Sequence, residues 1–170
     1  EDYNIRLDSP FEESNLCLTI AGNVSTRYTD REGSLSEIAE YIKTLVSARK
    51  GNYLIFFPSY KYMNEVFGLF TERYPGIGTI LQQPAMQEEE KERFLQCFCR
   101  DNDKELLGFA VMGGIFSEGI DLAGERLIGA VIVGVGLPQV CFERDIIMDF
   151  FKKKNNMGFE YAYMYPGMNK

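Results

Sequence analysis

The chain has 170 residues, of which 45% are hydrophobic and 14% aromatic, so it is long enough to bury the core of one domain. Its formal net charge of −7 argues against a free-standing nucleic-acid binder that works by bulk electrostatics, although it leaves room for a local basic groove. The sequence contains no histidine, which excludes Ser-His-Asp triads, Cys-His dyads and His-ligated metal sites built from this chain alone.

Targeting signals are not evident in the sequence. No run approaches the roughly 18 apolar residues of a membrane span, and the first residues, Glu-Asp-Tyr-Asn, lack the basic and apolar regions of a signal peptide. The four cysteines are expected to be buried free thiols of a reducing compartment: Cys17, Cys97, Cys99 and Cys141. We therefore expect a cytoplasmic protein.

Apolar patterning predicts strands and helices in alternation along the chain. The predicted strands cover residues 16–20, 53–57, 79–81, 106–112 and 127–133. One predicted helix begins at Ser34, and three others cover residues 60–73, 88–100 and about 140–154. The first helix has one apolar face, consisting of Leu35, Ile38, Ala39, Ile42, Leu45 and Val46. Because the strands are continuously apolar, they predict an α/β domain with a mostly parallel sheet and helices on both faces. No linker divides the chain, so residues 1–170 are expected to form a single domain.

Several conspicuous groups of side chains are suited to a structural role. The acidic run 88–90 falls in the first turn of a predicted helix, where it complements the helix dipole, and the basic run 152–154 suits a helix carboxyl end. Aromatic residues that recur at helical spacing indicate a core rather than a base-stacking ladder: Tyr60, Tyr62, Phe67 and Phe70.

The glycine-rich segment 113–121 lies between two predicted strands. Its glycines disfavour a helix, permit positive φ and allow a ligand to approach the backbone closely. Loops at the carboxyl ends of parallel strands are where open α/β sheets bind ligands. Glu118 and Asp121 are suited to accept hydrogen bonds from ribose hydroxyls or to hold a cation. The alternative is a surface turn with two solvated acids.

Two nucleotide-binding fingerprints are missing. The chain contains no Gly-Lys-Thr or Gly-Lys-Ser, so it has no Walker A motif. Gly134 and Gly136 follow a predicted strand, but Gln139 stands where the dinucleotide fingerprint needs its third glycine.

Three blocks of sequence carry a family resemblance. They are residues 24–28 (Val-Ser-Thr-Arg-Tyr), 54–63 (Leu-Ile-Phe-Phe-Pro-Ser-Tyr-Lys-Tyr-Met) and 114–121 (Gly-Ile-Phe-Ser-Glu-Gly-Ile-Asp). In this order and spacing the chain resembles the second RecA-like motor domain of superfamily 2 DNA helicases of the XPD/DinG type. The second block resembles helicase motif IV and the third resembles motif V, and the resemblance runs from about Leu16 to the last residue.

The resemblance implies a RecA-like three-layer sandwich that serves an ATP-dependent helicase moving 5′ to 3′ on single-stranded DNA. It implies ATP and Mg²⁺ as ligands of the intact enzyme, and an iron–sulfur cluster, where relatives have one, would lie outside this chain. The implied nucleotide-binding residues are Glu118, Gly119 and Asp121, and the implied DNA-binding residues are Arg27, Ser59, Tyr60, Gly113 and Ser117. No catalytic residue is expected in this chain.

Some of these residues are equally suited to a role in the fold itself. Ser59 is also placed to cap the helix that follows it, and Arg27 is able to pair with a nearby acid, Asp30 or Glu32. Tyr28 is either a stacking platform for a base, or it packs on the edge of the domain. Gly113 stands where many related helicases have a phosphate-binding threonine, so a backbone N–H would have to serve there.

The resemblance also indicates what the chain lacks. The Walker A lysine and the Mg²⁺-binding acids of the family lie on the first RecA-like domain, which is the expected partner. Motif VI, with its arginine finger, is expected to follow residues 165–170 almost at once. We therefore expect a fragment that is not an ATPase by itself. The alternatives are a flavodoxin- or Rossmann-like nucleotide-binding domain, or a protein-interaction module using the apolar loop 133–140.

Overall fold

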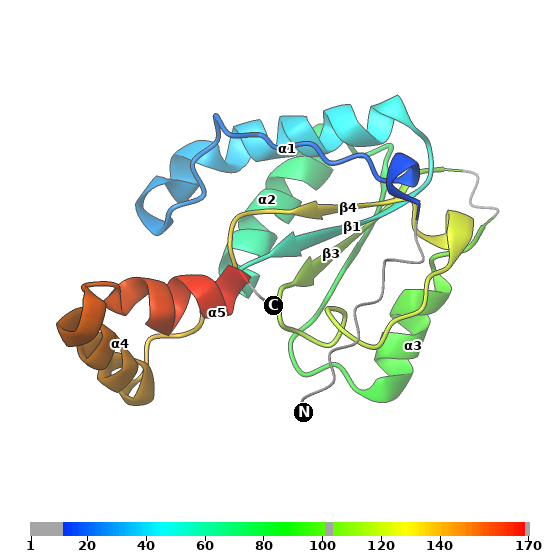
Figure 1. Ribbon diagram of the computed structural model, residues 1–170. Coiled ribbons are helices and arrows are strands. Elements are labelled where there is room, and N and C mark those ends of the chain that lie inside the picture. The colour runs from blue at the N-terminus through cyan, green and yellow to red at the C-terminus, as the bar shows by residue number, and fades with distance from the viewer. Residues whose placement is uncertain (1–11, 101–103, 169–170) are drawn as a thin grey trace.

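The computed structural model describes residues 12–100 and 104–168. They form a four-stranded parallel sheet in the order β2–β3–β1–β4, with helices on both faces (Figure 1). The strands are β1 (Asn52–Phe57), β2 (Gly78–Leu81), β3 (Leu106–Val111) and β4 (Gly129–Ile132). The helices are α1 (Arg31–Ala48), α2 (Tyr60–Arg73), α3 (Glu88–Gln96), α4 (Phe142–Asn155) and α5 (Tyr165–Met168). The predicted parallel α/β architecture is confirmed.

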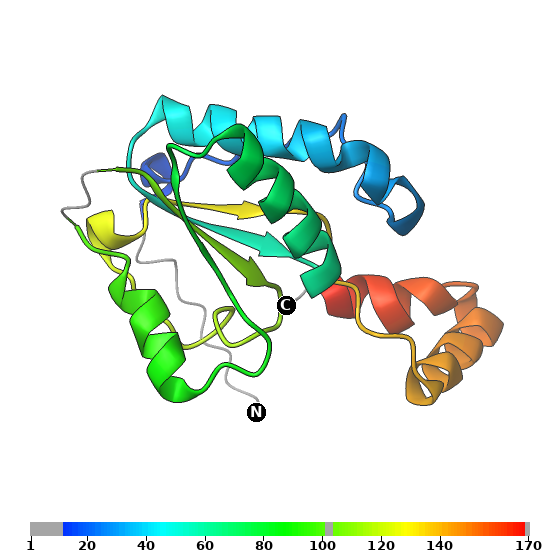
Figure 2. The same ribbon diagram turned by 180° about the vertical axis from the view of Figure 1, so that it is seen from behind.

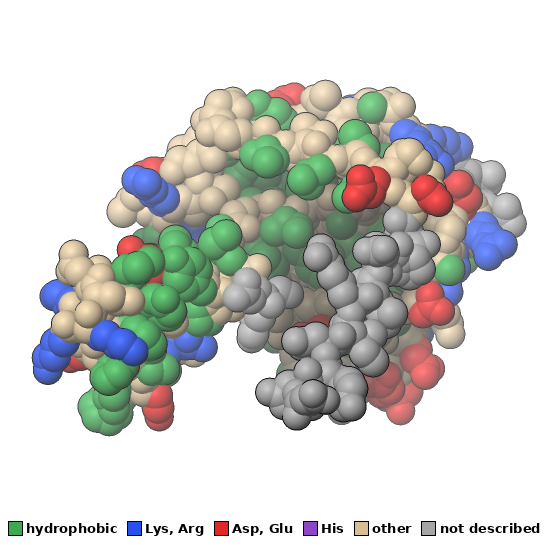
Figure 3. Space-filling model, viewed as in Figure 1, with side chains coloured by type: hydrophobic (Ala, Val, Ile, Leu, Met, Phe, Trp, Pro, Cys, Tyr) green, Lys and Arg blue, Asp and Glu red, His purple; other side chains and the backbone are tan. Residues whose placement is uncertain are grey.

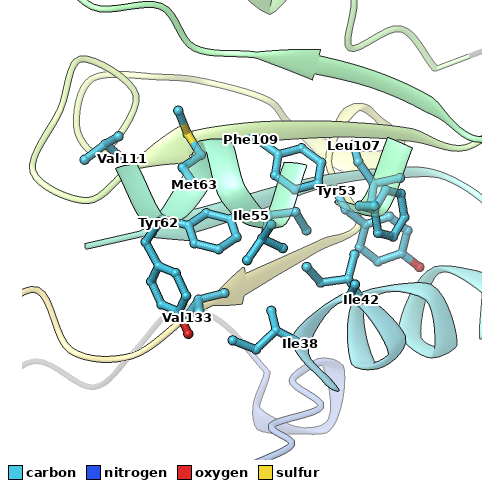
Figure 4. Close-up of a cluster of buried hydrophobic side chains, with 14 of the residues drawn as sticks. Ile38, Ile42, Tyr53, Ile55, Tyr62, Met63, Leu107, Phe109, Val111 and Val133 are labelled. Atoms are coloured by element: carbon cyan, nitrogen blue, oxygen red, sulfur yellow. The ribbon is translucent and has the colours of Figure 1, made fainter. Parts of the chain in front are cut away.

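The larger core lies between the sheet and the pair α1 and α2 (Figures 2 and 4). Successive side chains of a strand point to opposite faces, so Tyr53, Ile55 and Phe57 of β1 all enter this core. Phe109 of β3 lies at its centre, with its ring centroid 5.2 Å from that of Phe67 in α2. The aromatic residues of α2 therefore belong to the core, as their spacing predicts.

A smaller core lies between the opposite face of the sheet and α3. It is built from Leu54, Phe94, Phe98, Ala110 and Phe116. The α3 helix begins with a capping box, in which the Gln87 and Glu90 side chains bond each other's backbone N–H groups. The acidic run at the start of α3 is thus part of a helix start, as predicted.

The first helix begins earlier than the sequence indicates. Ser34 lies inside α1, where its hydroxyl donates to the Arg31 carbonyl at 3.0 Å and lies 2.8 Å from the Tyr62 hydroxyl. Leu45, expected on the buried face, is exposed, because α1 buries a narrower stripe than predicted. The third helix ends at Gln96 rather than Arg100, although Phe98 beyond it is still buried.

The predicted strand 16–20 is wrong. These residues pair with no strand in the described chain, and the side chains of Leu16, Leu18 and Ile20 are 76–81% exposed. A groove of about 360 Å³ separates Thr19 and Ile20 from the end of β4. An apolar run forms a strand only when a neighbouring strand completes its hydrogen-bond ladder.

The expected burial of the cysteines is also wrong, since all four are exposed. The thiol of Cys97 donates to the Arg93 carbonyl at 3.3 Å, and that of Cys99 donates to the Gln96 carbonyl at 3.0 Å. Both sulfurs therefore lie at the solvent-exposed end of α3, where they bond carbonyls that the helix leaves unpaired.

The last part of the described chain forms a helical arm (residues 142–168) that projects from the sheet (Figure 1). It contains α4, the π-helical turn η4 (Glu160–Met164) and α5. Phe151 of α4 stacks on Tyr161 of η4, with ring centroids 4.2 Å apart. The sequence analysis predicted neither η4 nor α5, and α5 contains Pro166 and Gly167, which are residues typical of loops. No helix among the described residues is long and apolar enough to cross a membrane.

Candidate functional site

Three segments of chain leave the sheet at the carboxyl ends of its strands. The last residues of β1 and β3, Phe57 and Val111, lie opposite each other, and the Met112 N–H donates to the Phe57 carbonyl at 2.8 Å. On the other side of β1, the Val133 N–H donates to the Phe56 carbonyl at 2.8 Å. The parallel ladder therefore brings the segments after β1, β3 and β4 to one edge of the sheet, which we call the carboxyl edge.

A cavity of about 580 Å³ opens at the carboxyl edge. Its lining comes from all three segments and from α5: Phe56, Pro58, Met112, Gly113, Ser117, Glu118, Ile132, Gly136, Leu137, Pro138, Gln139 and Gly167. Open α/β sheets bind ligands in this position. The cavity is thus the candidate ligand-binding site, and the glycine-rich loop 113–121 forms part of its lining.

The glycine-rich loop depends on its glycines for its conformation. Gly113 and Gly119 both have φ of 70°, in the left-handed region that favours glycine. The Gly114 N–H donates to the Val111 carbonyl at 3.1 Å, and the Ser117 N–H donates to the Gly114 carbonyl at 3.0 Å. The Ser117 hydroxyl donates to the Val111 carbonyl at 3.3 Å, which leaves its oxygen able to accept a hydrogen bond.

Two side chains anchor this loop to α3. Phe116 is 1% exposed and stacks on Phe94, with ring centroids 4.2 Å apart. Beyond the loop, Arg126 donates to three main-chain carbonyls, at 3.0 Å to Phe98, 3.2 Å to Asp121 and 3.4 Å to Leu95. The loop is therefore held at its middle and its end, so its ligand-facing residues are fixed by the protein.

Only one of the three residues expected to bind a nucleotide lines the cavity. Glu118 lines the cavity and is exposed, whereas Gly119 and Asp121 are exposed but lie outside the cavity lining. Asp121 is positioned through its carbonyl, which Arg126 holds, and its carboxylate faces solvent. Of the residues expected at DNA, Gly113 and Ser117 line the cavity with Glu118.

Ser59 and Tyr60 lie beside the cavity at the start of α2. The Ser59 hydroxyl oxygen accepts a hydrogen bond from the Tyr62 N–H at 3.4 Å, so Ser59 is the helix cap. Its O–H remains a donor for an incoming acceptor. Tyr60 is not among the residues that line the cavity, and its hydroxyl accepts a hydrogen bond from the Gln82 amide at 3.0 Å.

Arg27 is exposed and directly precedes the short 3-10 helix η2 (Tyr28–Asp30). Asp30 accepts hydrogen bonds from the Ser25 and Thr29 hydroxyls, which hold the pKa of its carboxyl below the ordinary value. Arg27 makes no ion pair within 4.0 Å among residues 12–100 and 104–168, although its charge also contributes to the lowered pKa of Asp30. Tyr28 is 79% exposed and does not pack on the domain edge.

Arg31 is a residue of this site that the sequence analysis missed. Its guanidinium carbon lies 4.8 Å from the ring centroid of Tyr62 and 5.5 Å from that of Tyr28, and its Nε donates to the Thr26 carbonyl at 3.3 Å. These contacts orient its two terminal nitrogens, which are suited to an anion. The signal was its position as the first residue of a helix, where the helix dipole disfavours a cation.

Both acidic and basic side chains lie near the carboxyl edge. Acidic side chains lie over α3 in Figure 3, and others lie on the arm. Thr26 packs against Gly134 beyond β4, where an added methyl group would lie 2.7 Å from the Thr26 hydroxyl oxygen. The segment with Arg27 and Arg31 thereby reaches the carboxyl edge, and it carries Asp30 and Glu32 beside these two cations.

Comparison with protein families and curated proteins gives consistent results. The helicase C-terminal domain family matches residues 42–170. The ATP-dependent DNA helicase CHL1 of Debaryomyces hansenii is 29% identical over 119 residues, covering 65% of this chain and 14% of that protein. The ATP-dependent DNA helicase CHL1 of Scheffersomyces stipitis is 33% identical over 92 residues, covering 50% of this chain and 11% of that protein. The chain thus spans a small part of the length of these relatives.

Solved structures share the fold. XPD in its apo form matches with a TM-score of 0.64 at 21% identity, over 85% of this chain and 29% of that chain. Another XPD helicase structure matches with a TM-score of 0.63 at 21% identity, over 85% and 25% of the two chains. The sheet and its covering helices therefore form a RecA-like domain, as the sequence resemblance implies.

Proposed function

Because the chain belongs to the helicase C-terminal domain family, we propose that it is the second motor domain of an ATP-dependent DNA helicase. The observation that carries the proposal is the carboxyl edge, where the loop resembling motif V and the helix start resembling motif IV flank one cavity. In this proposal residues 1–170 form a single domain of a longer polypeptide. That polypeptide unwinds DNA by moving 5′ to 3′ on a single strand.

The DNA side of the site is formed by Arg27, Arg31, Ser59, Gly113 and Ser117. The oriented guanidinium of Arg31 and the exposed one of Arg27 donate to phosphate oxygens, which supply most of the affinity in sequence-independent binding. Ser59 adds its free O–H, and the backbone N–H of Gly113 replaces the hydroxyl that a threonine would supply. The exposed Tyr28 ring is available to stack on a base. Tyr60 acts in this proposal through its hydrogen bond to Gln82 rather than by touching DNA.

The nucleotide side is formed by Glu118, Gly119 and Asp121. The Asp121 carboxylate accepts from ribose hydroxyls, and the positive φ of Gly119 allows the backbone to approach the nucleotide. Among the described residues, no group of three or more His, Cys, Asp or Glu side chains is placed to hold a metal ion.

In this proposal the first RecA-like domain of the same polypeptide supplies the Walker A lysine and the acids for Mg²⁺. ATP binds between the two domains and closes them on the strand, and hydrolysis releases this bridge. The isolated 170-residue chain then has no ATPase activity of its own. Any iron–sulfur cluster of the parent lies outside this chain.

The test uses the full-length polypeptide and two tailed duplexes. We expect ATP-dependent unwinding of a duplex with a 5′ single-stranded tail and none of a duplex with a 3′ tail. Asp121→Ala should lower DNA-stimulated ATP turnover roughly tenfold through loss of hydrogen bonds to the nucleotide. Glu125→Ala, an exposed acid in the 3-10 helix η3 (Gly124–Arg126), is the matched control and should leave turnover unchanged. Unwinding without ATP, or equal loss in both variants, would contradict the proposal.

A further inference from the structure

Gln82 is a buried polar residue that the proposed mechanism leaves unexplained. It follows β2 directly, and its side chain is 2% exposed. Its Nε2 donates to the Tyr60 hydroxyl at 3.0 Å, and its Oε1 accepts from the Val111 N–H at 2.9 Å. One side chain therefore joins the first residue of α2 to the last residue of β3.

The bond to Val111 replaces a bond of the sheet. The Gln82 N–H donates to the Phe109 carbonyl at 2.9 Å, which continues the parallel ladder beyond β2. In a regular parallel ladder, the Val111 N–H would next bond the main-chain carbonyl of Gln82. It bonds the side-chain carbonyl of Gln82 instead. The side-chain bond satisfies the buried Val111 N–H, while the main chain turns away from the sheet toward α3.

Val111 is hydrogen-bonded to the glycine-rich loop as well as to Gln82. Its carbonyl accepts from the Gly114 N–H and from the Ser117 hydroxyl. The Gln82 amide also packs directly on Gly114, where an added methyl group would lie 3.1 Å from Nε2. Gln82 thus contacts the start of the loop through both Val111 and Gly114.

We propose that Gln82 is a positioning residue that couples the start of α2 to the glycine-rich loop, so that the DNA-binding groups of both segments keep a fixed spacing. The path runs from Tyr60 through the Gln82 amide and the Val111 peptide to Gly114 and Ser117. Buried polar connections of this kind have one low-energy arrangement, since an unpaired donor inside the protein is costly. The functional part of this inference rests on the proposed DNA-binding role, whereas the coupling itself does not.

The coupling is tested without DNA on the isotope-labelled 170-residue chain. Gln82→Met keeps the length of the side chain but removes the acceptor for Val111, and exposed Gln83→Met is the matched control. We expect the Val111 amide to exchange with solvent about tenfold faster in Gln82→Met, relative to the amides of β1, and not in Gln83→Met. Unchanged exchange at Val111 would overturn the inference.

Tyr60→Phe provides a second test, and its measurement in the otherwise unchanged chain does not depend on Gln82→Met folding. Loss of the Tyr60 hydroxyl should shift the amide resonances of Val111, Gly114 and Ser117 in the otherwise unchanged chain. In the Gln82→Met background the same substitution should leave those resonances in place. Equal shifts in both backgrounds, or none in either, would refute coupling through Gln82.

The functional part is measured in the full-length protein as affinity for a fluorescent oligothymidine. Gln82→Met should weaken binding about tenfold and Gln83→Met should not. Unchanged affinity in Gln82→Met would overturn the role of Gln82 in DNA binding. A full-length protein that binds no oligothymidine would count against the proposed function, while the amide measurements would still decide the coupling.

Discussion

The anchoring of the glycine-rich loop by Phe116 leads to a quantitative prediction. Phe116 is fully buried in the smaller core and stacks on Phe94 with centroids 4.2 Å apart. Phe→Ala substitutions at such sites cost about 3–5 kcal/mol through lost transfer free energy and the cavity that remains. Because each kcal/mol shifts Tm by about 2–4 °C in a chain of this size, Phe116→Ala should lower Tm by roughly 6–20 °C.

Ile115→Ala is the matched control, since Ile115 is the adjacent residue of the same loop and is 38% exposed. Urea unfolding of both variants, followed by circular dichroism, measures the two losses of stability. Ile115→Ala should cost less than about 1 kcal/mol. A loss below about 1 kcal/mol for Phe116→Ala, or equal losses for both, would refute the view that Phe116 fixes the loop.

Three further predictions concern the backbone, a cation and a buried hydroxyl. Gly114→Ala, whose methyl group would lie 3.0 Å from the Val111 carbonyl oxygen, should cost about 1–3 kcal/mol in urea unfolding. Gly113→Ala meets open space but has a positive φ, so it should cost only about 1–2 kcal/mol; the reverse order would contradict this account. Arg126→Met should speed amide exchange at Asp121 and its neighbours, because three carbonyls lose their donor, and unchanged exchange there would argue against the anchor. Burial raises the pKa of Tyr62 above 10.0 despite its bond to Ser34, so the neutral hydroxyl stabilises the fold below that pH. This stability should fall as the pH rises through and beyond about 10, and Tyr62→Phe should fall less steeply in urea unfolding across that range.

The central strands and α2 could be predicted from the sequence because their signals are local. The apolar run of β1 ends just before Pro58. Ser59 then caps a helix whose predicted bounds match those observed. The run 16–20 has an equally apolar composition but no pairing partner in the described chain, and partnership is not a local property. The prediction that the cysteines are buried failed for a related reason. The average burial of a residue type does not show whether a particular residue lies at the exposed end of a helix.

The position of the candidate site was predictable, whereas the direction of its side chains was not. A glycine-rich loop after a parallel strand must lie at the carboxyl edge. Which loop residues face the cavity depends on Phe116 and Arg126, which reach across the fold to α3. The role of Gln82 depends on a hydrogen bond between residues 29 positions apart in the chain. Such contacts follow from packing and leave no local pattern in the sequence.

The central claim is that the carboxyl edge binds single-stranded DNA, and the most direct test is titration of the isotope-labelled chain with an oligothymidine. The account predicts that amide resonances of residues 27–31, Ser59 and 113–117 move together, and that those of the first turn of α3 do not. It also predicts that Arg31→Gln weakens binding and reduces the dependence of log K on log salt by about 0.7, the value for one phosphate contact. Shifts confined to the arm or to α3, or an unchanged salt dependence in Arg31→Gln, would contradict the claim.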